Sequence, residues 1–224
     1  MRITLHLVRH GQTYFNRYNR LQGWSNSPLT TQGRDDARRA ADHLRDMAFD
    51  AAYCSDTTRA METAAVILDV NERAGHARPE LTTSPAFREQ FYGYFEGRDM
   101  SESWWAAGAP HGAATYADIV RDHGLAATRD FLKQADPFHD AESDEEYWRR
   151  IESGFDLIAS NPHLKNGSHV LQISHGNTLL SLINRFGSGD GVMTTRPANG
   201  SVTVLSFDTG MPLDAGVRVL AVGD

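Results

Sequence analysis

Three residues with complementary chemistry stand at the end of the first predicted strand. Residues 2–8 are mostly apolar and lead directly into Arg9, His10 and Gly11. In open α/β sheets, ligands bind at the carboxyl ends of the strands. A guanidinium matches the oxygens of a phosphate, an imidazole can act as nucleophile or base near neutral pH, and glycine lets a ligand approach the backbone. The run predicts a phosphate site with a reactive histidine, although a strand followed by a polar turn explains these three residues alone equally well.

The residues that follow extend the motif. They are Gln12, Thr13, Asn16, Leu21-Gln22-Gly23-Trp24, Ser27-Pro28-Leu29-Thr30 and Gly33. Their order resembles the signature of the histidine phosphatase superfamily, the phosphoglycerate-mutase-like enzymes. That signature is Arg-His-Gly-(Glu/Gln)-Thr, an Asn three residues on, Gln-Gly, then Asp-x-Pro-Leu-Thr and a Gly. This chain departs from it at Asn26, where the family has Asp. Since Asn makes the same turn contacts as Asp, we expect the turn to be kept.

Three later blocks carry the same resemblance. Residues 55–64, with Arg59, are similar to the family's Ser-x-x-x-Arg-Ala-x-x-Thr-Ala helix start. Residues 87–97, with Glu89, are similar to its Arg-Glu-x-x-(aromatic)-Gly-x-x-Glu-Gly stretch. His175-Gly176 is similar to its second His-Gly at a strand end. Because the blocks appear in family order, the resemblance extends to residue 177.

The resemblance implies phosphoryl transfer through a phosphohistidine on His10, with a backbone carbonyl holding the other ring nitrogen. Arg9 and Arg59 would compensate the charge of the phosphate. Glu89 would protonate the leaving oxygen and later deprotonate water. His175 would donate to a phosphoryl oxygen, and in its protonated form it would add charge stabilisation. The expected secondary phosphate contacts are Asn16, Gln22, Gly23, Gly176 and Asn177.

Other chemistries and locations fit the sequence less well. The chain has ten histidines, but His10 and His175 lack the His-x-x-x-His or Cys-x-x-Cys spacing of common metal sites, so no metal and no cofactor is expected. Cys54 is the single cysteine; it excludes an internal disulfide, fits a reducing compartment, and is expected to pack in the core. The apolar start is too short for a signal peptide, and no stretch approaches the roughly 20 residues of a membrane helix. We therefore expect a cytoplasmic protein with no membrane partner.

Strand and helix patterns alternate along the chain. This alternation is typical of an α/β fold with a mainly parallel central sheet flanked by helices. The expected strands are 2–8, 49–54, 81–84, 168–174, 201–207 and 217–222. The expected helices are 31–46 with Thr30 as N-cap, 57–70 capped by Asp56, about 114–134, 144–160 opened by a Ser143/Glu146 capping box, and 176–186. We expect one domain over residues 1–224, in which an insertion at about 97–145 forms a cap over the site.

Two local patterns have ordinary explanations. Trp104-Trp105 is expected to serve the core rather than to stack on a substrate. The glycine-rich run 187–191 resembles a dinucleotide loop, but it follows a predicted helix rather than a strand. We therefore expect a flexible loop there.

The net charge of −7 is concentrated in one segment. Residues 97–146 hold four basic and eleven acidic side chains, a difference equal to the net charge of the whole chain. An acidic lobe beside the site would repel a second phosphate, and family mutases carry clustered Arg and Lys in this insertion. We therefore predict a phosphomonoester hydrolase. The alternatives are phosphoglycerate-mutase-type transfer and a non-catalytic phospholigand-binding module.

The expected partner is a small phosphorylated metabolite. Nucleic acid is excluded because no basic stripe is present to meet its backbone. The sequence leaves the substrate and the oligomeric state open.

Overall fold

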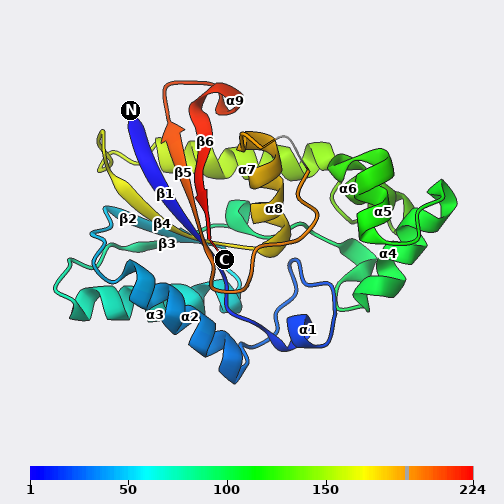
Figure 1. Cartoon of the computed structure of the whole chain (residues 1–224), viewed down its shortest axis with the longest axis horizontal. Coiled ribbons are helices and arrows are strands. Elements are labelled where there is room, and N and C mark those ends of the chain that lie inside the picture. Colours follow the sequence, from blue (N-terminus) through cyan, green and yellow to red (C-terminus); the bar gives the residue numbers. More distant parts are fainter. Residues whose placement is uncertain (190–191, 224) are drawn as a thin grey trace.

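The computed structural model describes residues 1–189 and 192–223, and a six-stranded sheet runs through them in the order β3-β2-β4-β1-β5-β6 (Figure 1). The strands are β1 (Arg2–Arg9), β2 (Ala51–Cys54), β3 (Leu81–Thr83), β4 (His169–Ser174), β5 (Val202–Asp208) and β6 (Val217–Val222). Neighbours among the first four strands pair in parallel, whereas β5 is antiparallel to both β1 and β6. The expected mainly parallel α/β sheet is confirmed.

Helices cover both faces of the sheet (Figure 1). On one face α2 (Thr31–Leu44) and α3 (Thr58–Arg73) pack against apolar side chains that include Val8. On the other, α7 (Asp144–Ala159) and α8 (Gly176–Phe186) pack against Leu5 and Leu7. Successive side chains of a strand point to opposite faces, so Ile3, Leu5 and Leu7 of β1 enter one core and Val8 enters the other. This burial fixes the strand whose carboxyl end carries Arg9 and His10.

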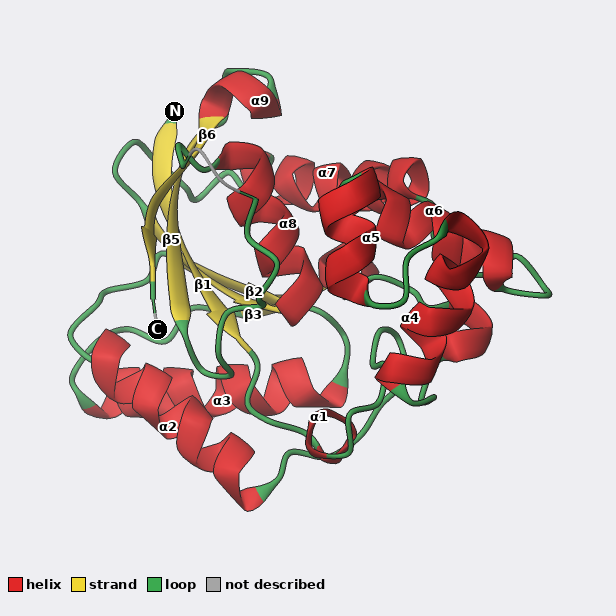
Figure 2. Ribbon diagram, turned by 45° about the vertical axis from the view of Figure 1, so that its right-hand side comes forward, coloured by secondary structure: helices red, strands yellow, loops and turns green. Residues whose placement is uncertain are grey.

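The insertion forms a separate helical lobe, which we define as residues 100–135. It contains α4 (Met100–Gly108), α5 (Tyr116–His123) and α6 (Leu125–Ala135), and it lies beside the sheet and its helices (Figure 2). The expected single helix at 114–134 is wrong, because Gly124 adopts a φ of +85° and separates α5 from α6. Helix α4 is an addition to the expected elements. The buried side chains shared by the lobe and its neighbours are Leu21, Tyr92, Phe95, Trp104, Ala107, Ala113, Ile119 and Leu132.

The remaining elements are short. They are α1 (Tyr14–Arg17), α9 (Leu213–Gly216) and single 3₁₀ turns at Pro85–Phe87, Gly93–Phe95 and Ala109–His111.

Two of the three expected helix caps are confirmed. The Thr30 side chain accepts from the Gly33 N–H, and Ser143 and Glu146 form the capping box of α7. The expected cap at Asp56 is wrong: this carboxylate forms an ion pair with Arg88, and α3 begins after Thr57.

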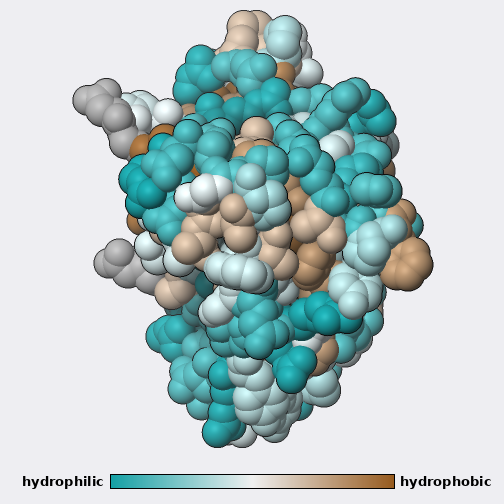
Figure 3. Space-filling view, turned by 90° about the vertical axis from the view of Figure 1, so that its right-hand side faces the viewer, coloured by the Kyte–Doolittle hydropathy of each residue, from teal (hydrophilic) through white to brown (hydrophobic). Residues whose placement is uncertain are grey.

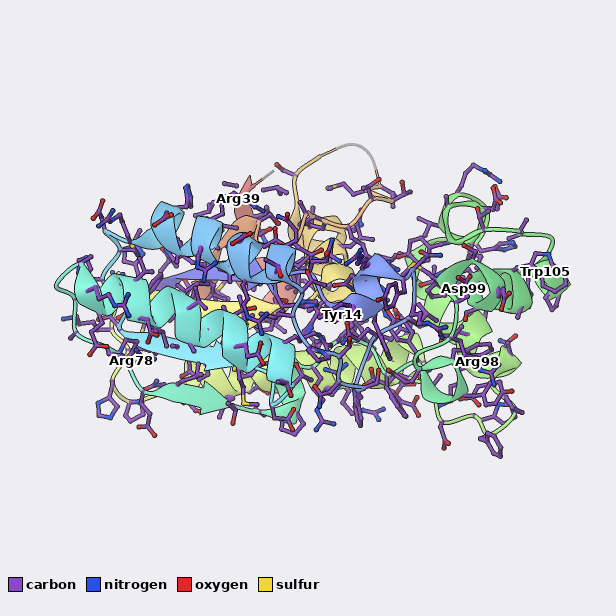
Figure 4. The ribbon with its side chains drawn as sticks, turned by 90° about the horizontal axis from the view of Figure 1, so that it is seen from below. Tyr14, Arg39, Arg78, Arg98, Asp99 and Trp105 are labelled. Atoms are coloured by element: carbon purple, nitrogen blue, oxygen red, sulfur yellow. The ribbon has the colours of Figure 1, made fainter. Side chains whose placement is uncertain are left out.

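Cys54 and Trp104 are buried, as expected for core residues. Trp105 is 61% exposed and lies at the outer end of the lobe (Figure 4). Part of the run 187–191 lies outside the described residues. None of the helices described has the length and apolarity needed to cross a membrane.

Candidate active site

His10 is the first residue after strand β1, and its imidazole is neutral and held in one orientation. Its Nδ1 lies 2.8 Å from the carbonyl oxygen of Gly11. A carbonyl only accepts hydrogen bonds, so Nδ1 carries the proton and Nε2 keeps its lone pair. Burial, followed by the charges of Arg59 and Arg9, holds the pKa of His10 well below its usual value. The ring is therefore neutral at neutral pH, with Nε2 unprotonated and able to act as a nucleophile. The expected backbone carbonyl partner of the other ring nitrogen is confirmed.

Close backbone packing fixes the loop that follows His10. A Cβ on Gly11 would lie 2.0 Å from the carbonyl oxygen of Gly33, and one on Gly33 would lie 2.0 Å from that of Gln12. Only glycine fits at either position. From the other side, the Asn199 amide donates to the His10 carbonyl oxygen over 2.8 Å. The loop is thus clamped between α2 and the segment before β5.

His175 lies directly beside His10, with ring centroids 5.2 Å apart. Its Nδ1 is 3.2 Å from a guanidinium nitrogen of Arg59, which can only donate, so Nδ1 accepts. The Nε2–H then donates to Ser55 Oγ over 3.0 Å. Burial, then the charges of Arg59 and His10, keep the pKa of His175 well below its usual value. The imidazolium form expected to assist catalysis is therefore not the form in the unliganded protein.

Arg59 is a completely buried cation. Its guanidinium donates to the carbonyl oxygens of Ser25, at 3.0 Å, and Gly23, at 2.7 Å, while Nε has no hydrogen-bond partner among the described residues. Burial lowers the pKa of Arg59 to about 10. A buried charge without a counterion is unfavourable, so this arrangement suits a bound anion.

Arg9 offers a second cation to the same place. One of its terminal nitrogens donates to the carbonyl oxygen of Pro197, and its buried Nε has no partner in the part of the chain described. Burial, followed by the charge of Arg196, lowers the pKa of Arg9 to about 10. No described carboxylate lies within 4.0 Å of the Arg9 or Arg59 guanidinium. Both cations can therefore serve an anionic ligand.

Glu89 reaches the site by binding the start of helix α8. Its Oε2 accepts the Asn177 N–H at 2.7 Å. Its Oε1 accepts from the Thr178 N–H, the Thr178 hydroxyl and the Gln90 N–H, at 2.9–3.0 Å. A carboxylate at a helix N-terminus is stabilised by the helix dipole. Oε2 accepts one of these hydrogen bonds and Oε1 accepts three, so Oε2 keeps more of its capacity for a further contact. No pattern around Glu89 in the sequence predicts this contact with α8.

Side-chain contacts, backbone contacts and chain adjacency together bring the five expected catalytic residues close to one another. Arg59 and His10 both neighbour His175, Arg9 is adjacent to His10 in the chain, and Glu89 binds the helix that His175 precedes. They come from β1, α3, the segment after β3, and the junction of β4 with α8. The structure therefore gathers all five at the carboxyl end of the parallel strands.

The expected secondary contacts occupy varied positions. The Oδ1 of Asn16 accepts the Thr13 N–H and helps to cap α1, and Asn16 also lines the cleft described below. Gln22 is buried, with its Nε2 lacking a partner among the described residues, so it can donate to a ligand. Gly23 supplies a carbonyl to Arg59. A Cβ on Gly176 would lie 3.0 Å from Arg196 Cδ and 3.2 Å from Arg9 Cζ, so this glycine leaves space for two arginines.

Asn177 connects several groups of the site. Its side chain donates to the Tyr92 hydroxyl over 2.6 Å and accepts from Arg196 Nε. Arg196 and Asn199 were not expected from the sequence. They lie between α8 and β5, in residues 192–201, to which no helix or strand is assigned and whose sequence shows no hydrophobic periodicity.

A cleft of about 460 Å³ opens at Arg9. The residues that line it are Arg9, Gln12, Asn16, Asn19, Met100, Tyr116, Thr194, Thr195, Arg196 and Asn199. This lining contains two arginines and no carboxylate. The expectation of an acidic lobe at the mouth is therefore wrong: the lobe contributes Met100 and Tyr116 to the cleft.

Several acidic side chains of the expected insertion are occupied by backbone N–H groups or by arginines outside the cleft. Asp136 accepts four backbone N–H groups, from Tyr94, Phe138, Asp140 and Ala141. Asp144 pairs with Arg129, and Glu142 pairs with Arg150. The outer face of the lobe is largely hydrophilic around a small apolar strip (Figure 3). Net charge along the sequence therefore did not predict the charge of the cleft.

Comparison with known proteins gives consistent matches over nearly the whole chain. The family model of the histidine phosphatase superfamily (branch 1) matches residues 5–213. A 2,3-bisphosphoglycerate-dependent phosphoglycerate mutase from Parvibaculum lavamentivorans is 30% identical over 208 residues, which cover 90% of this chain and 89% of the relative. A crystal structure of phosphoglycerate mutase from Bacillus anthracis is 30% identical, with a TM-score of 0.86, and the match covers 100% of this chain and 93% of that one.

A putative alpha-ribazole-5'-P phosphatase from Escherichia coli is also similar in structure. It has a TM-score of 0.66 and 19% identity, and the match covers 99% of this chain and 96% of that one. At this identity the likeness shows the fold alone.

Proposed function

The chain belongs to the histidine phosphatase superfamily, and we infer that it hydrolyses phosphomonoesters through a phosphohistidine on His10. The observation that carries this proposal is the neutral His10 ring, with Nε2 unprotonated, beside two arginines that have no described carboxylate partner within 4.0 Å. A nucleophile and a pocket for the phosphoryl oxygens are the parts that phosphoryl transfer requires.

In the first step, Nε2 of His10 attacks phosphorus and the bond from phosphorus to the alcohol oxygen breaks. Arg9, Arg59 and the Gln22 amide donate to the phosphoryl oxygens as charge shifts toward the leaving oxygen. Protonated Glu89 gives its proton to that oxygen, so a neutral alcohol leaves. The products of this step are the free alcohol, phosphohistidine and the Glu89 carboxylate.

In the second step, water attacks the phosphohistidine. The Glu89 carboxylate takes a proton from the water as its oxygen bonds to phosphorus, and the bond from Nε2 to phosphorus breaks. The electron pair of that bond returns to Nε2. Inorganic phosphate is released, Glu89 is again protonated, and the Gly11 carbonyl keeps the His10 ring in place for the next cycle.

The positions of the basic side chains in the insertion favour hydrolysis over mutase chemistry. Arg121 pairs with Asp118 and Asp122, Arg129 with Asp144, and Lys133 with Glu146. Arg98 lies over the Tyr94 ring, with Cζ 3.9 Å from its centroid. None of these four lines the cleft. A mutase must retain a bisphosphorylated intermediate, and the insertion gives it no cluster of cations for the distal phosphate.

Phosphoglycerate mutase activity is the second candidate. The names of the similar proteins support it better than hydrolysis, and Arg196 is a cation in the cleft that a distal phosphate could engage. This candidate shares the phosphohistidine step and differs in the acceptor of the phosphoryl group.

A comparison of reaction rates distinguishes the hydrolase from the mutase. Release of inorganic phosphate is measured for p-nitrophenyl phosphate and a panel of alkyl monophosphates, beside interconversion of 2- and 3-phosphoglycerate primed with 2,3-bisphosphoglycerate. The proposal expects hydrolysis of a panel member to be faster than interconversion. Interconversion faster than every hydrolysis would establish the mutase.

A further inference from the structure

Arg196 holds a position between the catalytic core and the helical lobe. On the core side, its Nε donates to the side-chain oxygen of Asn177 at the start of α8. On the lobe side, a terminal nitrogen lies 3.2 Å from the sulfur of Met100, and Cζ lies 5.3 Å from the centroid of the Tyr116 ring. The guanidinium therefore spans the cleft from α8 to α4 and α5.

The charge of Arg196 has no described counterion. Its partners are an amide oxygen, a thioether and an aromatic ring, and no carboxylate of the described residues lies within 4.0 Å. A thioether is a weak acceptor, so an anionic oxygen would replace the contact with Met100 favourably. Arg9 lies nearby, because both arginines pack over Gly176, and its charge adds to the local positive potential.

The two arginines of the cleft face different parts of a substrate. Arg9 is adjacent to the nucleophile, so it serves the phosphoryl group. Arg196 contacts the lobe residues Met100 and Tyr116, which also line the cleft. His10 does not itself line the cleft, but its chain neighbour Arg9 does, so the alcohol portion of a phosphomonoester bound at His10 has room to extend along the cleft toward Arg196.

Building on the proposed function, we propose that Arg196 is a specificity-determining residue that binds an anionic group, such as a carboxylate, on the alcohol portion of the substrate. The preferred substrates are then phosphomonoesters of hydroxy acids or similar anionic alcohols. In this chain the distal cation comes from the segment between α8 and β5 rather than from the insertion. This differs from the sequence-based expectation of an acidic lobe that repels a second phosphate.

The test compares matched substrates that differ by one charge. Phospholactate and phospholactamide have the same size, and kcat/KM is measured for each with the wild-type protein, Arg196→Gln and Arg98→Gln. An arginine–carboxylate contact should give wild type a preference of about 10- to 100-fold for phospholactate. Arg196→Gln should bring the ratio near one. Arg98→Gln, which removes an arginine outside the cleft, should keep the wild-type ratio.

A binding measurement makes the test independent of turnover. Calorimetry with 3-phosphonopropionate and its amide should show the same loss of preference in Arg196→Gln, and raised salt should weaken binding of the carboxylate more than of the amide. An unchanged carboxylate preference in a folded Arg196→Gln protein overturns the proposal. So does a wild-type protein without that preference, even if it hydrolyses p-nitrophenyl phosphate and so retains the proposed function. If no hydrolysis occurs but the binding preference depends on Arg196, the proposed function fails and the assignment of Arg196 holds.

Discussion

A guanidinium nitrogen of Arg59 lies 3.2 Å from Nδ1 of His175, and this contact fixes the protonation of the second histidine in the site. Because the guanidinium cannot accept a hydrogen bond, His175 is neutral, with its proton on Nε2 toward Ser55. The same Arg59 charge helps to keep His10 neutral. The buried charge of Arg59 therefore favours the neutral form of both imidazoles in the unliganded protein.

The first prediction concerns these two rings. Burial and the neighbouring arginines hold the pKa of His10 and of His175 well below 6.5, so both remain neutral as the pH falls through 6.5. In ¹⁵N NMR spectra of the unliganded protein, assigned with His10→Ala and His175→Ala, neither ring should titrate between pH 6 and 8. A midpoint near the ordinary value for either ring would contradict the described electrostatics.

The second prediction concerns Glu89 as the acid. Glu89→Gln should slow alkyl phosphates by about 10²–10⁴-fold, and an aryl phosphate much less, because an aryl oxide leaves without protonation. The substitution also places an amide NH₂ group among the donors of α8, so stability must be measured in parallel. Thr178→Val is the matched control, because it removes one donor to Glu89 and keeps the carboxylate. Equal losses on both substrate types would show that Glu89 is not the proton donor.

The third prediction concerns the departure from the family pattern at Asn26. Its Oδ1 accepts the Thr58 N–H over 3.0 Å in the first turn of α3, the helix that carries Arg59. Asn26→Ala should lower the free energy of unfolding by about 1 kcal/mol, as the loss of a helix cap does. Asn26→Asp keeps the acceptor and should be as stable as wild type or slightly more so. Urea unfolding of the three proteins checks the order, which an unchanged Asn26→Ala would contradict.

The fourth prediction concerns acid stability away from the site. His6 Nε2 lies 3.0 Å from His169 Nδ1, and burial, followed by the charges of His169 and His43, lowers the pKa of His6 to about 4. In the unfolded chain the His6 imidazole takes up a proton near pH 6.5, whereas in the folded protein it does so only near pH 4. The contribution of neutral His6 to the free energy of unfolding is therefore fully present above pH 6.5 and is lost as the pH falls toward 4. The loss should reach about 2–3 kcal/mol. Denaturant unfolding across this range should show a smaller loss for His6→Leu than for wild type; equal losses would contradict the assignment.

Strands and helix caps could be predicted from the sequence because they depend on residues that are close together in the chain. The apolar run of β1, the Thr30 cap and the capping box at Ser143 each depend on residues close in sequence. The motif blocks found Arg59, Glu89 and His175 only through family resemblance. Their side chains meet because parallel strands share one edge.

Features that depend on distant partners escaped prediction. Asn199 supports the His10 carbonyl from 189 positions away, and no pattern around it indicates this role. Asp56 stands where a helix N-cap is expected, but its carboxylate forms an ion pair with the distant Arg88 instead. The acidic insertion was expected to repel anions because the net charge of a sequence segment does not show which carboxylates are neutralised in ion pairs. The pair of Asp144 with Arg129 is one example.

The central claim is that a phosphoryl group is transferred to Nε2 of His10. The most direct measurement is to mix the wild-type protein with a rapidly reacting aryl phosphate, quench under alkaline conditions that preserve phosphohistidine, and map the modified peptide by mass spectrometry. The account predicts one phosphoryl group on His10, formed within the first turnover and absent from His10→Ala. Turnover of the same substrate with the phosphoryl group on another residue, or undiminished turnover by His10→Ala, would contradict it.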